Sequence, residues 1–180
     1  LIATGQGGGL TEGQIIGDFY SQYFTYVNVL SLILQLFVVS RVVKYLGVQW
    51  AVMILPCIAL GAYNIMAFIP TLRIVLGAKV AENSTDYSLN NTVRNMLFLP
   101  CTYEEKFSAK QAIDSFFVRM GDVLSAALVF FGTNVIQLEP REFAAVNGVL
   151  VLIWLVLAWQ VGKIYMQRTA AAPVPAPAAA

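Results

Sequence analysis

Charged residues recur through residues 73–122, in or beside segments that are hydrophobic enough to lie in a bilayer. A charge at membrane depth is unfavourable by roughly 2.5–3.5 kcal/mol on insertion scales, so such residues usually face a polar cavity or pair with another charge. The region therefore indicates a membrane protein that handles something polar. The residues concerned are Arg73, Lys79, Glu82, Asp86, Arg94, Lys106, Lys110, Asp114, Arg119 and Asp122.

Polar side chains gather on one face of the helix expected over residues 71–99. At 100° per residue they fall within an arc of roughly 120°, the arrangement expected of a helix that lines a water-filled pathway. A salt-bridge network between helices that only fixes packing is the alternative interpretation. The pathway candidates on this face are Lys79, Glu82, Asp86, Asn90 and Arg94, with Asn83 beside them.

A second group of candidates lies at the start of the next expected helix. Lys106, Lys110 and Asp114 follow one another at intervals of four residues, so they share a face. Cations at the mouth of a pathway attract an anionic solute. Ordinary anchoring of lysines on the cytoplasmic side is an equally good interpretation of Lys106 and Lys110 taken alone. We keep Lys110 and Asp114 as pathway candidates.

The composition predicts an integral membrane protein. Hydrophobic residues make up 58% of the 180 residues, charged residues only 12%, and mean hydropathy is +0.70, whereas about 25% of a soluble domain is charged. The sequence has no histidine, and its two cysteines, Cys57 and Cys101, stand alone in apolar surroundings. We expect free thiols, no metal or other cofactor, no nucleic-acid partner and no enzyme activity.

The expected fold class is all-α, a polytopic membrane bundle of about five transmembrane helices. Each apolar segment is long enough to cross about 30 Å of hydrocarbon. Residues 1–18 are rich in glycine and are expected to form a loop, residues 41–47 a turn, and residues 169–180, almost all Ala and Pro, a disordered tail. The expected spans, which together make up a bundle over residues 19–168, are approximately 19–40, 48–69, 71–99, 107–137 and 143–166.

Basic residues in the connecting segments predict the orientation of these spans. Arg73 and Arg141 lie in connections on one side of the predicted bundle, whereas the other basic residues of the connecting segments lie on the opposite side. Because cytoplasmic loops carry an excess of Lys and Arg, the N-terminus is expected outside and the C-terminus in the cytoplasm. The basic residues expected on the cytoplasmic side are Arg41, Lys44, Lys106, Lys110, Lys163 and Arg168.

Two stretches resemble known carriers. Residues 40–47, Ser-Arg-Val-Val-Lys-Tyr-Leu-Gly, resemble the short cytoplasmic loop between the eighth and ninth helices of major facilitator superfamily transporters. Residues 86–122 resemble the ATP/ADP translocase family of plastids and intracellular bacteria. This second match consists of Asp86-Tyr87-Ser88-Leu89, Arg94, Met96-Leu97-Phe98-Leu99-Pro100, Glu104 and Glu105, Lys106, Lys110, Ile113-Asp114 and Gly121.

The resemblance implies a fold and a role for one lysine. The chain would correspond to helices eight to twelve, the C-terminal bundle of a twelve-helix carrier in a bacterial inner (plasma) membrane. In that family a lysine ahead of an Ala-Ile/Val-Asp run is implicated in nucleotide exchange, and Lys110 is the matching residue. Asn95 and Asp122 differ from the family pattern, which usually has an acidic residue and a lysine at these positions.

The expected function is that of part of a secondary transporter for an anionic solute, with ATP/ADP-type nucleotide exchange as the specific form. The expected partners are membrane lipid and the N-terminal half of a carrier, since such carriers place the site between two halves near the bilayer midplane. The alternative is a transporter-derived accessory subunit of a larger membrane complex, with no transport activity. The two differ in whether solute or protein faces the polar stripe.

Overall fold

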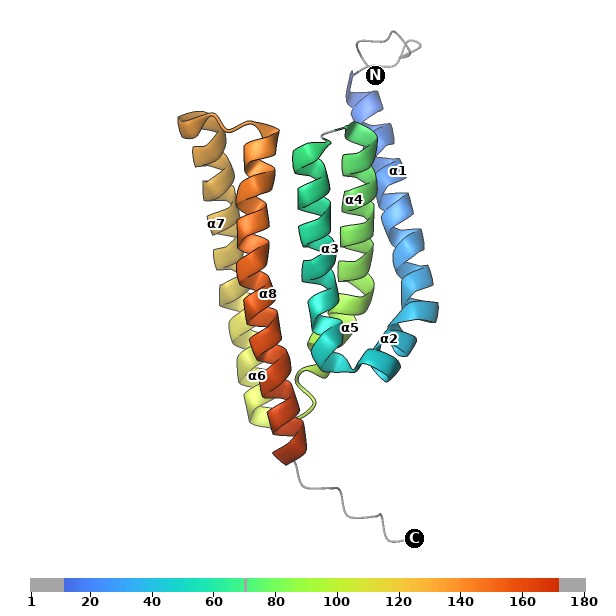
Figure 1. Ribbon diagram of the computed structural model, residues 1–180, viewed down its shortest axis with the longest axis vertical. Coiled ribbons are helices and arrows are strands. Elements are labelled where there is room, and N and C mark those ends of the chain that lie inside the picture. The colour runs from blue at the N-terminus through green and yellow to red at the C-terminus, as the bar shows by residue number, and fades with distance from the viewer. Residues whose placement is uncertain (1–11, 70, 172–180) are drawn as a thin grey trace.

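The computed structural model describes residues 12–69 and 71–171, and within these ranges every regular element is a helix. Several elements follow one another without a break, so the chain runs as five long helical rods joined by short turns (Figure 1). The elements are α1 (Glu12–Ile33), η2 (Leu34–Val38), α2 (Val39–Leu46), α3 (Val48–Phe68), α4 (Leu72–Thr85), η3 (Asp86–Asn90), α5 (Asn91–Met96), α6 (Tyr103–Ala112), η4 (Ile113–Phe117), α7 (Val118–Phe131), η5 (Gly132–Ile136) and α8 (Pro140–Ala171), where η denotes a π-helical turn.

Four of the rods are long and apolar enough to cross a membrane. They cover Gly13–Leu46, Val48–Phe68, Tyr103–Ile136 and Pro140–Ala171. The fifth rod, α4 to α5, runs beside α1 and α3 but carries too many charges to qualify by composition. The all-helical membrane character is therefore confirmed, and the count of five spans stays a prediction.

Three of the expected boundaries were wrong. Residues 12–18 belong to α1 instead of a loop, and the expected turn at 41–47 is helical up to Gly47. At the other end, α8 continues to residue 171, into the expected tail. In each case a helix continues past the apolar segment, because its backbone hydrogen bonds do not depend on contact with lipid. The remainder of the expected loop and tail, residues 1–11 and 172–180, lies outside the described residues.

Helix α3 is at the centre of the bundle, with α8 on one side and α4 on the other, and α1 packs on the far side of α4 (Figure 1). The contact between α3 and α8 is the most extensive in the described part of the chain. Small side chains allow it, since they let two membrane helices approach closely. The buried residues of α8 are Ala144, Val151, Ala158 and Gly162, and the backbone of Gln49 in α3 lies directly against Gly162.

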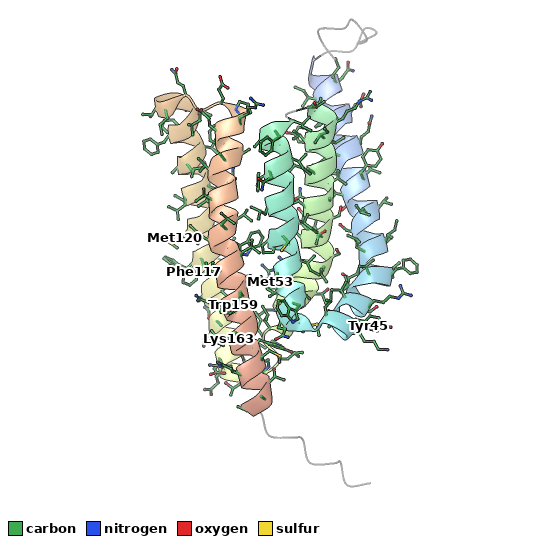
Figure 2. The ribbon with its side chains drawn as sticks, in the orientation of Figure 1. Tyr45, Met53, Phe117, Met120, Trp159 and Lys163 are labelled. Carbon is green, nitrogen blue, oxygen red and sulfur yellow. The ribbon has the colours of Figure 1, made fainter. Side chains whose placement is uncertain are left out.

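The rod Tyr103–Ile136 is attached to the others mainly at its two ends. At one end the Phe143 ring lies against Gly132, and at the other Arg168 pairs with Glu105 at 3.2 Å. Between them, α7 contains no buried residue. Phe117 and Met120 point away from α8 and α3 (Figure 2). This rod therefore has most of its surface free within the described part of the molecule.

Gly47 makes the turn between α2 and α3 possible. Its φ of 77° and ψ of 163° lie in a region that is essentially restricted to glycine. We predict that Gly47→Ala lowers the free energy of unfolding by about 1–3 kcal/mol, because a Cβ is strained there. Thermal unfolding in detergent measures this. Gly61→Ala, inside α3 with no atom within 4 Å of the added Cβ, is the matched control and should have no comparable effect.

Candidate functional site

The predicted polar face lies on the rod α4–η3–α5, which is held between α1 and α3 (Figure 1). The side of this rod that packs against its neighbours carries Ser84, Ser88, Leu89 and Val93, all buried. The predicted candidates are half-buried, apart from Arg94, which is exposed. The polar face is thus neither sealed in the bundle nor turned fully outward.

Lys79 is the centre of one cluster in this face. Its Nζ donates to Glu82 Oε2 at 2.8 Å and to the Tyr63 hydroxyl at 3.0 Å, and it lies 4.7 Å from the centre of the Tyr63 ring. The side chains of Lys79 and Glu82 are 35% and 17% exposed. The cation is therefore already neutralised by a carboxylate and fixed to α3 through a tyrosine. Tyr63 was not predicted, because nothing in its own apolar segment indicates a polar partner.

A set of polar contacts connects α4 with α1. Asn83 donates from Nδ2 to the Tyr23 hydroxyl, Ser84 donates to the carbonyl of Val27 at 3.2 Å, and Ser31 donates to the carbonyl of Ser84 at 3.3 Å. Ser84 and Ser88 are almost completely buried. These contacts use small hydroxyl groups between closely packed helices, as membrane bundles commonly do. We assign them to packing, and they were not predicted from the sequence.

Asp86 and Asn90 form the next pair along the rod. They begin and end the π-helical turn η3, and Asn90 Nδ2 donates to Asp86 Oδ1 at 2.7 Å. Single π-helical turns inside α-helices are frequent at functional sites, because the extra residue redirects the side chains that follow. Asp86 and Asn90 are four residues apart, so their contact agrees with the common face predicted for them, and the π-helical turn lies between them.

Lys110 reaches the same face from the neighbouring rod. Its Nζ donates to Asn95 Oδ1 at 3.0 Å, which connects α6 with the end of α5. Asn95 is a neutral partner, so the lysine keeps its full charge. Arg94 and Asp114 are exposed, and their side chains make no hydrogen bond or ion pair with any other residue of the described ranges. The structure therefore joins four candidates in two pairs, Lys79 with Glu82 and Asp86 with Asn90. It connects Lys110 to a residue outside the candidate set and leaves Arg94 and Asp114 apart.

The polar face has, at one end, two cations that no carboxylate of the described residues neutralises. Arg94 and Lys110 have no acidic partner among residues 12–69 and 71–171. Cations of this kind favour an anionic ligand. In the same ranges, no three His, Cys, Asp or Glu side chains come close enough together to hold a metal ion. The arrangement is suited to binding an anion.

Comparison with known proteins points to one kind of carrier. No family model matches the chain, and no solved structure matches it. The chain is similar to ADP,ATP carrier protein 1 of Chlamydia pneumoniae, at 23% identity over 85% of this chain and 34% of the carrier. It is also 22% identical to the proteins of the same name in Chlamydia muridarum and Chlamydia trachomatis, over 85% of this chain and 33% of each carrier.

The similarity extends well beyond the stretch that first suggested it. The predicted match was best over residues 86–122, whereas the alignments cover 85% of the chain. The resemblance to ADP,ATP carriers is therefore confirmed at the level of distant similarity. The chain spans about a third of the length of the curated relatives it matches.

Proposed function

We propose that this chain forms part of a secondary membrane carrier for an anionic solute, with a nucleotide as the first candidate. The distant similarity to ADP,ATP carrier proteins supports a transport role. An anion is proposed because the polar face ends at Arg94 and Lys110, and no carboxylate among the described residues neutralises these two cations. Solute would move past Lys79, Glu82, Asp86 and Asn90 by alternating access. The other half of the carrier would line the opposite side of this pathway.

The orientation belongs to the same proposal. The segments that carry most of the basic residues, namely α2, the start of α6 and the end of α8, lie together at one end of the bundle (Figure 1). Arg73 and Arg141 belong to segments at the opposite end. The positive-inside rule would then put the C-terminal end of α8 in the cytoplasm of a bacterial inner membrane. Lys110 would face solute arriving from the cytoplasm.

Lys110 provides the most direct test. In the full-length natural polypeptide reconstituted into liposomes, we expect Lys110→Ala to raise KM for labelled ATP or ADP exchange about tenfold, the effect of losing roughly 1.4 kcal/mol of binding energy. Lys110→Arg should retain most of the affinity, because it keeps the positive charge. Initial rates of exchange over a range of nucleotide concentrations give the KM values.

Lys106→Ala is the matched control. Lys106 lies one turn earlier on α6 and is exposed, and its side chain makes no hydrogen bond or ion pair within the described residues. If both variants change KM equally, the lysines act as general surface charge and Lys110 has no specific role. A wild-type protein that exchanges no nucleotide, but remains bound in a stable complex, would support the accessory subunit instead.

A further inference from the structure

The middle of the rod Tyr103–Ile136 carries charges that face no partner. Asp114, Arg119 and Asp122 are exposed, and none of their side chains forms a hydrogen bond or ion pair with another residue in the described part of the chain. Arg119 and Asp122 lie near the centre of a 34-residue helix that is apolar enough to span the membrane. Charges at that depth are not left against hydrocarbon, so this surface needs a polar or charged cover.

These charges are part of a longer stripe on α7, which we call the α7 stripe. It is defined by Arg119, Asp122, Ala126, Val129 and Thr133, which recur at intervals of three and four residues and so share one face. A shallow furrow of about 570 Å³ runs along it, lined by Asp122, Ser125, Ala126, Val129, Phe130, Thr133 and Asn134. Small side chains in the furrow leave room for a second helix to approach closely.

The opposite face of the same helix is purely apolar. Leu124 lies two residues from Ala126, a rotation of about 200°, and is 61% exposed. Met120 and Phe131 are also exposed and lie on that side. The helix therefore has one face suited to lipid and another that is not.

We propose that a transmembrane helix from outside these 180 residues packs along the α7 stripe and presents a basic side chain to Asp122. The stripe and Asp114 together carry two acidic residues and one basic residue, so the complementary helix carries a net positive charge. The source of that helix rests on the proposed function, in which this chain is part of a longer carrier. The relatives are about three times as long as the matched region, which leaves ample chain to supply it.

Photo-crosslinking from the furrow tests this directly. In the full-length natural polypeptide, Cys57 and Cys101 are replaced by serine, Ala126→Cys is introduced, and a benzophenone maleimide is attached. After irradiation in the native membrane, mass spectrometry identifies what the probe has joined. We expect a transmembrane peptide of the same polypeptide, outside the 180 residues, to be the main product. Leu124→Cys is the matched control on the lipid face and should give only lipid adducts.

The other outcomes overturn the proposal. A probe at position 126 that joins only lipid shows that the stripe faces the bilayer, and a product with a second copy of the polypeptide shows an oligomer contact instead. The experiment requires no transport, so failure of nucleotide exchange together with the expected crosslink would reject the proposed solute and leave the helix contact standing.

Tryptophan substitution gives an independent readout in the same polypeptide. We expect Ala126→Trp to lower the melting temperature in detergent by at least 5 °C, because the ring would displace the packed helix. Leu124→Trp should shift it by less than 2 °C, because lipid or detergent accommodates a larger side chain. Equal shifts for the two variants would contradict a packed partner at the stripe.

Discussion

Replacing Gly162 by valine is expected to destabilise the bundle by about 3 kcal/mol, at the upper end of what overpacking a well-packed site produces. A Cβ at Gly162 would lie 2.8 Å from the Gln49 carbonyl oxygen and 3.4 Å from the Gln49 Cα. Both atoms are backbone, so no side-chain rotation relieves the contact. The α3 and α8 helices would have to separate, and they form the most extensive helix contact in the described part of the chain.

Thermal unfolding in detergent measures this effect, with the helical circular dichroism signal recorded as the temperature rises. Gly148→Val on the same helix is the matched control, because no atom lies within 4 Å of a Cβ added there. Both variants place the same β-branched residue in α8, so the difference between them isolates the contact with Gln49. Similar stabilities for the two variants would show that α3 and α8 do not approach as closely as described.

Removing the charge of Lys79 is expected to have the second large effect. In Lys79→Gln the half-buried carboxylate of Glu82 loses its ion pair. Breaking a fully buried pair in this way is unfavourable by 3–5 kcal/mol, so we expect about 2 kcal/mol for this partly exposed pair. If solute passes Lys79, the exchange rate of the full-length polypeptide should also fall at least tenfold.

The double substitution Lys79→Glu with Glu82→Lys separates packing from transport. The swapped residues can form the same pair one turn apart, and the Tyr63 hydroxyl can donate to the new carboxylate, so most of the stability should return. Exchange should remain low if solute requires a cation at position 79. Recovery of both stability and exchange would show that the pair only fixes the packing of α4.

The positions of the helices were predictable because each follows from an apolar run. Their ends were not, since α1 starts at residue 12 and α8 continues to residue 171 through segments that contain no strong helix breaker. Gly47 was predicted as part of a seven-residue turn, although a single glycine with positive φ is sufficient. Hydropathy limits the length of a span, whereas hydrogen bonding and glycine geometry limit the length of a helix.

The candidate site was predictable only along one helix. Regular spacing placed Lys79 and Glu82 on one face of the helix, and the structure pairs them at 2.8 Å. Their third partner, Tyr63, and the Lys110–Asn95 contact depend on how separate helices are placed against one another, which one sequence does not reveal. The role of the polar face in transport stays a prediction that the variants above address.

The extensive contact between α3 and α8 has a consequence for the order in which the chain assembles during synthesis. Helix α3 is complete at residue 68, whereas α8 begins only at residue 140, so the ribosome must add the whole of α4 to η5 before the main partner of α3 exists. Until then α3 must remain in the bilayer by its own apolarity, supported mainly by α2 and by the rod that follows it. Arg141 then donates to the carbonyls of Ala67 and Phe68, at 3.1 and 3.5 Å, and so joins the start of the last helix to the end of the second rod. Among the helices that the structure describes, α8 is therefore the last to join the bundle.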